Sequence, residues 1–138
     1  MALLNARILL DDGAASAALT AVDNLLTNIR QGQTHATSLL VEALLLHSKV
    51  WRSMDELRRA QSAATEALEA ARSLAIATDQ SSHVGMAMLE LATTQLAAGE
   101  TERGLASALG AKRVLSYSLG EAHSATLTAI ALSEMPSS

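Results

Sequence analysis

The stretch that decides the fold is residues 96–104, LAAGETERG, in which the turn glycine Gly99 is followed five residues later by the small residue Gly104. The same arrangement occurs at residues 10–18 (LDDGAASAA) and 52–60 (RSMDELRRA), where Asp55 takes the place of the glycine. The turn residues at positions 13, 55 and 99 are therefore spaced by 42 and then 44 residues. A turn that recurs at this period predicts an array of stacked helical hairpins. Such arrays offer extended surfaces for binding and seldom carry catalytic chemistry.

The composition favours a single helical domain. The chain has 138 residues, of which 49% are apolar, enough to bury a core without metals or crosslinks. Aromatic residues make up only 1%, so the core must consist of aliphatic side chains between closely spaced backbones. The single proline, Pro136, lies almost at the end of the sequence and interrupts no helix. Cysteine is absent, which excludes disulfides and thiolate metal sites and fits a cytoplasmic location.

The charge balance limits the classes of partner. A net charge of −4 argues against a general attraction to nucleic acid or to anionic membranes, so we expect neither as a direct partner. The apolar run in residues 1–10 is too short to span a bilayer and is interrupted by Arg7. The mean hydropathy of +0.22 is nevertheless high, so part of the apolar surface is expected to face another subunit or a further domain.

Apolar residues that recur every three or four positions predict about seven helices in one domain over residues 1–138. Hairpins are expected at about residues 2–31, 34–77 and 82–119, with Thr34 and Asp55 as helix caps. A terminal helix at about 123–135 is apolar on nearly every side and should be buried, as a lid or as half of a further repeat. We expect Leu127, Ile130 and Leu132 to form a homodimer interface or to be covered by another part of a larger chain.

Small residues occur where the two helices of each hairpin must cross. They precede each turn at Ala6, Ser48 and Ala92 and follow it at Ala18, Ala60 and Gly104, so that Gly104 is expected to face the helix near Ala92. This pattern resembles the tetratricopeptide repeat in its longer form of a little over forty residues, and residues 119–126 (LGEAHSAT) are similar to the link between such repeats. The resemblance implies antiparallel hairpins stacked as a right-handed superhelix. An up-and-down helical bundle is the alternative, because short loops suit both architectures.

The first half of the chain has a narrower likeness. Residues 6–10 (ARILL), Gly13, residues 18–19, residues 25–26 and residues 42–46 (EALLL) resemble the helical repeats of MalT-type regulators of the LuxR family. This resemblance implies the sensor region of a bacterial transcription regulator, which receives a small inducer or an inhibitory protein. The nucleotide-binding and DNA-binding companions of such a sensor do not occur in the sequence, since it has no phosphate-binding loop and no basic helix-turn-helix.

The histidines do not form a catalytic or metal-binding pattern. His35, His83 and His123 fall at equivalent helix starts, which a stack places about 10 Å apart, whereas metal ligands lie at ~2 Å from the ion. We interpret them as caps or surface residues, and His47 as a packed histidine, with a proton switch as its alternative role. We expect no catalytic residues, no cofactor and no metal. A hydrolase or metal enzyme built from His47 and Glu42 is the weakest hypothesis.

The predicted binding surface is a concave groove lined by the first helix of each hairpin. Ten residues are expected to face it: Arg7, Leu10, Glu42, Leu45, Lys49, Arg52, Met86, Leu89, Thr93 and Leu96. Basic residues at one end and aliphatic residues at the other suit a peptide or helix with acidic and apolar parts. The alternative is that the cations are merely solvated and that Met86 and Leu89 belong to the core. The leading function is a non-enzymatic module for a protein, peptide or small effector, and the alternative is a scaffold that assembles through its terminal helix.

Overall fold

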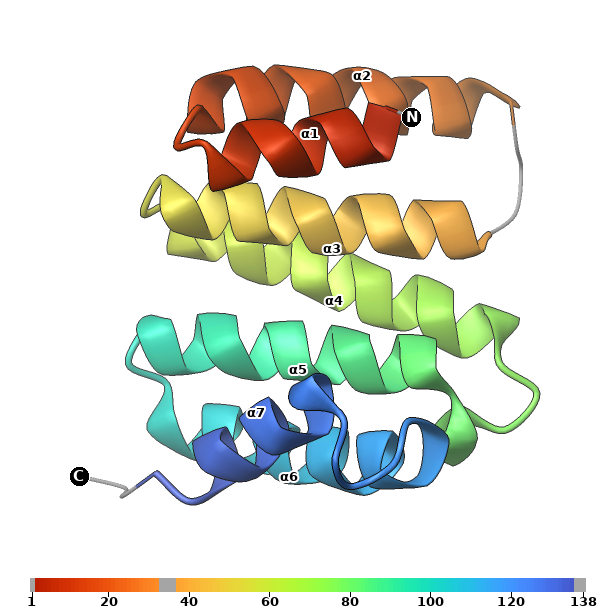
Figure 1. Cartoon of the computed structure of the whole chain (residues 1–138), viewed down its shortest axis with the longest axis vertical. Coiled ribbons are helices and arrows are strands. Elements are labelled where there is room, and N and C mark those ends of the chain that lie inside the picture. The colour runs from red at the N-terminus through yellow and green to blue at the C-terminus, as the bar shows by residue number, and fades with distance from the viewer. Residues whose placement is uncertain (1, 33–36, 136–138) are drawn as a thin grey trace.

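The computed structural model describes residues 2–32 and 37–135, and this part of the chain contains seven α-helices, one short 3-10 helix and no strand. The predicted all-α class and helix number are confirmed. The helices are α1 (Ala2–Asp11), α2 (Ala15–Gly32), α3 (Ser38–Ser53), α4 (Leu57–Leu74), η1 (Thr78–Gln80), α5 (Ser82–Ala97), α6 (Thr101–Ser118) and α7 (Ser124–Ser133). Figure 1 shows three hairpins, α1–α2, α3–α4 and α5–α6, stacked one on the next, with α7 folded back over the third. None of the described helices has the length and apolar character needed to cross a membrane.

The three predicted turns share one backbone geometry. Gly13, Asp55 and Gly99 have φ angles of 82°, 60° and 82°. At each turn the amide of this residue donates to the carbonyl three residues earlier, and the next amide donates to the carbonyl five residues earlier, at 2.8–3.1 Å. This pattern ends a helix with one left-handed residue and satisfies its last carbonyl groups. Aspartate enters the left-handed region more readily than most residues, which explains why Asp55 can replace a glycine here.

Small buried residues lie where the helices of each hairpin cross. Ala6, Ala18, Ser48, Ala60 and Ala92 are fully buried, and the Ser48 hydroxyl donates to the Ala60 carbonyl at 2.8 Å. In the third hairpin Gly104 is buried and leaves no room for a side chain, because an added Cβ would lie 2.5 Å from Leu96 Cγ. The residue against Gly104 is thus Leu96, one helical turn beyond the predicted Ala92.

The start of α3 differs from the prediction. Thr34, the expected cap, and His35 lie outside the described residues. The helix begins at Ser38, and its cap is Thr37, whose hydroxyl accepts a hydrogen bond from the Leu40 amide at 3.2 Å. Thr37 has the extended backbone that this cap position requires, with φ −133° and ψ 164°.

Asp55 was also wrongly expected to cap α4. Its left-handed backbone ends α3, and the residue at the N-cap of α4 is Glu56, which makes no side-chain cap bond. Helix α4 ends at Leu74, earlier than the predicted residue 77, because the backbone of Ala75 is already extended. Helix α7 ends at Ser133, short of the predicted residue 135.

Helix α7 is covered on one face only. Ala125, Thr126 and Ala129 are buried, and the alanines pack with Leu89 of α5 and Leu115 of α6. The other face, which the sequence predicts to be covered by a second copy or by another part of a larger chain, is open among the described residues, and Leu127 on it is 53% exposed. Ile130 and Leu132 are half-buried. Helix α7 is therefore a one-sided lid on the third hairpin.

Candidate ligand-binding pocket

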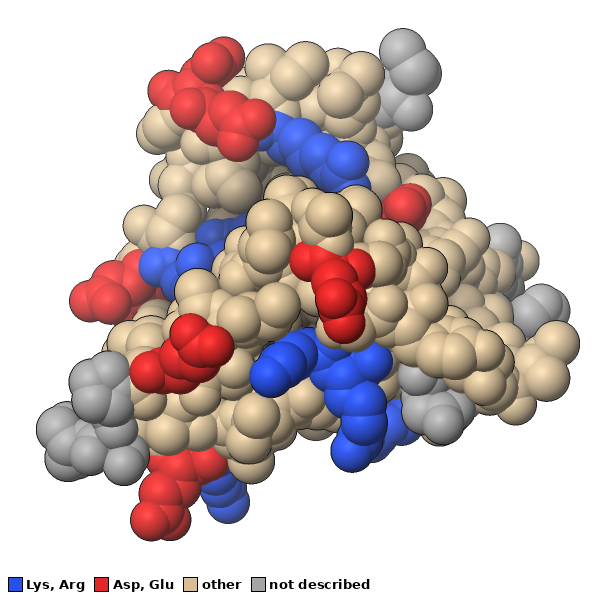
Figure 2. All heavy atoms as spheres, turned by 60° about the horizontal axis from the view of Figure 1, so that its bottom comes forward, with Lys and Arg blue, Asp and Glu red and all other residues tan. Residues whose placement is uncertain are grey.

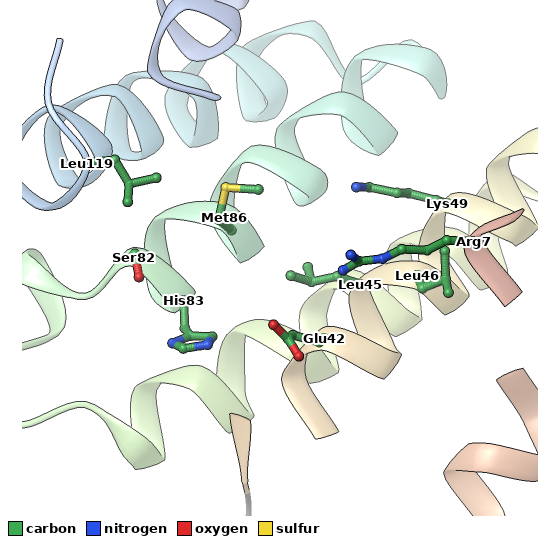
Figure 3. Close-up of a pocket in the computed structure, with 9 residues that line it drawn as sticks. All are labelled: Arg7, Glu42, Leu45, Leu46, Lys49, Ser82, His83, Met86 and Leu119. Atoms are coloured by element: carbon green, nitrogen blue, oxygen red, sulfur yellow. The ribbon is translucent and has the colours of Figure 1, made fainter. Parts of the chain in front are cut away.

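The first helices of the three hairpins enclose a pocket of about 270 Å³ (Figure 3). Its lining side chains come from α1, α3, α5 and the residue that ends α6: Arg7, Glu42, Leu45, Leu46, Lys49, Ser82, His83, Met86 and Leu119. The four residues from α3 follow the spacing i, i+3, i+4, i+7, which places them on one helix face. Helices α1 and α5 pack on either side of α3 and form the other walls of the pocket.

A second cleft of about 340 Å³ continues the pocket towards α1. Arg7, Leu46 and Lys49 line both spaces, and Leu10 and Asp11 complete the second. The two spaces together form a groove that crosses the first helices of all three hairpins. We call it the α1–α3–α5 groove.

Six of the ten predicted groove residues line these spaces: Arg7, Leu10, Glu42, Leu45, Lys49 and Met86. The other four do not. Leu89 is buried against α6 and α7, and the Thr93 hydroxyl donates to the Leu89 carbonyl of its own helix at 2.9 Å. Leu96 packs against Gly104. The prediction fails beyond the first two turns of α5 because α7 and the crossing with α6 occupy that half of the helix.

Arg52 is the fourth exception, because it is held in an ion pair with Glu90 of α5. Its guanidinium nitrogens donate to both carboxylate oxygens of Glu90 at 3.2 and 3.3 Å, and the Ser48 hydroxyl lies 3.1 Å from the same carboxylate. Only 5% of the Glu90 side chain is exposed. Burial raises the pKa of Glu90, while Arg52 and Lys49 act in the opposite direction. Arg52 therefore joins the second hairpin to the third and is not a free cation for a ligand.

Five lining residues were missed from the sequence as groove residues: Asp11, Leu46, Ser82, His83 and Leu119. The prediction placed His83 correctly at a helix start, but only as a cap or surface residue. As the second residue of α5 it forms the pocket wall opposite Arg7 and Lys49 (Figure 3). His123 is a true cap, since its Nδ1 accepts a hydrogen bond from the Ala125 amide at 3.1 Å.

The charged side chains that line the groove, Arg7, Lys49, Glu42 and Asp11, form no ion pairs among the described side chains. Among the described side chains, no carboxylate lies within 4.0 Å of the Arg7 guanidinium or the Lys49 ammonium. Glu42 lines the same pocket but forms no ion pair at that distance with any described cation. Two cations beside the apolar side chains of Leu45 and Met86 suit a ligand that combines an anionic group with an aliphatic body.

His47 lies outside this pocket in a cluster of its own. Its Nε2 is 2.8 Å from Nε1 of Trp51 and 3.2 Å from Oδ1 of Asp23. The indole N–H can only donate, so the bond to Trp51 requires an unprotonated Nε2, whereas the contact with Asp23 favours a proton there. Arg59 lies over the Trp51 ring at 4.9 Å. Among the side chains that the structure describes, no three from His, Cys, Asp or Glu are placed to hold a metal ion.

The fluorescence of Trp51 is expected to change as the pH falls below about 6.5. Burial is the main cause that lowers the pKa of His47, and Arg30 adds to it, while Asp23 and Glu66 oppose them. Folding thus favours the neutral ring, and its contribution to stability is complete above 6.5 and is lost as the pH falls through the lower, folded-state pKa. Protonation also removes the acceptor of the indole N–H. Emission spectra recorded at a series of pH values give the midpoint of this change, and the His47→Gln variant serves as the reference. A midpoint at or above 6.5, or the same midpoint in the variant, would contradict the assignment of the change to His47.

Comparisons with known proteins do not assign the chain to a family. No family model matches the chain, and no curated protein sequence matches it significantly.

Proposed function

We propose that this chain is a non-enzymatic binding module that holds a protein or peptide segment, or a small effector, in the α1–α3–α5 groove. The observation that carries the proposal is the pair of cations, Arg7 and Lys49, without carboxylate partners among the described residues and beside an aliphatic wall. An anionic group of the ligand would form charge-assisted hydrogen bonds there, and its apolar part would contact Leu45 and Met86. The right-handed superhelical winding stays a prediction.

The resemblance to the repeats of MalT-type regulators extends this proposal. A groove of this kind would suit the sensor part of a bacterial transcription regulator, which must receive an effector or an inhibitory protein. The polar groups Ser82, His83 and Glu42 on the pocket walls give such a site donors and acceptors that can distinguish one ligand from another.

Peptides that pair glutamates with leucines on one helical face should bind, and Lys49→Glu should weaken them about tenfold, because a reversed charge repels the acidic group. Fluorescence anisotropy of a labelled peptide measures the affinity. Arg58→Glu, an exposed charge on α4, is the matched control and should leave the affinity unchanged. Equal affinities for wild type and Lys49→Glu would remove the groove from the proposal. Arg52 is unsuitable for this test because its charge reversal would break the ion pair with Glu90.

A scaffold that assembles through α7 is the second candidate, and the exposed Leu127 supports it. A copy of α7 could cover this face in a homodimer. Leu127→Glu should then convert dimers to monomers in sedimentation velocity. Ile130 and Leu132 are poorer choices than the sequence indicated, because both are half-buried within the chain and their replacement by glutamate would also loosen α7.

A further inference from the structure

The outer surface of α6 carries a second groove, of about 690 Å³, that the proposed function does not use. Its lining residues are Met88, Ala106, Leu109, Gly110, Lys112, Arg113 and Ser116. Ala106 and Gly110 are one helical turn apart and form a row of small residues beside Leu109, which is 53% exposed. An added Cβ at Gly110 would meet the terminal methyl of Met88, so the glycine lets Met88 form part of the apolar floor. We call this the α6 groove.

The charge of the α6 groove is positive. Among the side chains that the structure describes, no carboxylate lies within 4.0 Å of Lys112 or Arg113. Arg72 adds a third cation, because it lines a small cleft together with Arg113. On the face shown in Figure 2, charged side chains form small groups on a surface that is mostly uncharged. Neighbouring cations beside an apolar floor select an acidic, apolar partner.

Helix α1 of the same protein has this chemistry on its exposed face. Leu4 and Ile8 are 51% and 49% exposed, and they are followed by the exposed acidic residues Asp11 and Asp12. Leu4, Ile8 and Asp12 follow the i, i+4, i+8 spacing of one ridge on a helix. Neither Asp11 nor Asp12 pairs with a cation among residues 2–32 and 37–135.

We propose that α1 of one copy docks into the α6 groove of a second copy. The spacings match: Leu4, Ile8 and Asp11 lie at i, i+4 and i+7 on α1, as Ala106, Gly110 and Arg113 do on α6. In a parallel arrangement the two aliphatic side chains lie over the small residues beside Leu109, and the acidic end of α1 reaches Lys112 and Arg113. The ridge of one helix then fills the groove of the other.

The contact joins two different surfaces of identical chains, and one such contact between two copies is heterologous. The pair keeps one free α6 groove on the copy that supplied its α1, and one free α1 face on the other copy, so assembly continues beyond the dimer until a ring closes or a filament grows. A contact through α7 on itself would stop at the dimer. The inference does not rest on ligand binding in the α1–α3–α5 groove.

Sedimentation velocity over a wide concentration range tests this contact. The wild type should form species larger than dimers, with weaker assembly at high salt. Ile8→Glu and Leu109→Glu should each lower the association constant at least tenfold. An equimolar mixture of the two variants should form dimers and nothing larger, since each variant supplies the surface that the other lacks. Both positions are exposed, so circular dichroism should show unchanged helicity.

Leu39→Glu is the matched control, because it introduces the same charge at another exposed leucine, on α3 and outside both surfaces of the contact. It should assemble as the wild type does. A second variant set uses charge alone: Asp11→Lys and Arg113→Asp should each weaken assembly, and the two together in one chain should restore it. A wild type that stays monomeric, a mixture that fails to dimerise, or dissociation by Leu127→Glu alone would overturn the proposal.

Discussion

Gly104→Leu should lower the free energy of unfolding by about 1–3 kcal/mol or more, because the crossing of α5 and α6 has no space for a side chain. An added Cβ would lie 2.5 Å from Leu96 Cγ and 3.1 Å from the Leu96 backbone nitrogen. The backbone atom cannot rotate away, so α5 and α6 must move apart and lose contacts along the hairpin. Chemical denaturation followed by circular dichroism gives the change in unfolding free energy.

Two other glycines serve as controls for this substitution. Gly32, at the end of α2, has open space around it, so Gly32→Leu should change stability only slightly. Gly110→Ala should be milder than Gly104→Leu, because the atom it meets is the terminal methyl of Met88, which can rotate away. If Gly104→Leu is as stable as Gly32→Leu, the close crossing is not a requirement of the fold.

Arg52→Met should destabilise the protein by about 2–4 kcal/mol, because it leaves the Glu90 carboxylate buried without its cation. A third of the Arg52 side chain is exposed, so water can partly replace it, and the lower half of this range is expected. The loss should diminish as the pH is lowered, since protonation of Glu90 removes the unpaired charge. Denaturation curves at two pH values measure both effects.

A double-mutant cycle separates the ion pair from the packing at this site. Glu90→Leu combined with Arg52→Met replaces both charges by apolar groups and should recover most of the stability lost in Arg52→Met. Arg58→Met, at an exposed arginine on α4, should have little effect. A single Arg52→Met variant as stable as Arg58→Met would show that the pair does not join the second and third hairpins.

The turns could be predicted from the sequence because each depends on a few neighbouring residues. Gly13, Asp55 and Gly99 all take the left-handed backbone that their residue types allow, and small residues at fixed distances from them are buried. The capping residues were harder to predict. Several Ser, Thr or Asp residues near a helix start can serve, and the loop conformation decides among them, as it does for Thr37.

The groove was predicted on α1 and, except for Arg52, on α3, but only in part on α5, because helical periodicity does not say what covers a face. Leu89 repeats with Met86 on α5, yet the return of α7 buries it. Glu90 was missed, although a carboxylate in a run as apolar as residues 84–92 (VGMAMLELA) is a signal for a buried partner. Recognising Arg52 as that partner, from 38 positions earlier, requires the stacking of the hairpins.

Methyl NMR of the methionines tests most directly the central claim that the α1–α3–α5 groove is the ligand-binding face. Met86 lines this groove, whereas Met88, two residues along the same helix, lines the α6 groove. Assignment by Met86→Leu and Met88→Leu identifies the two signals. An acidic, leucine-containing peptide should shift the Met86 methyl resonance and leave that of Met88 in place. A bound peptide that shifts Met88 but not Met86 would contradict the account.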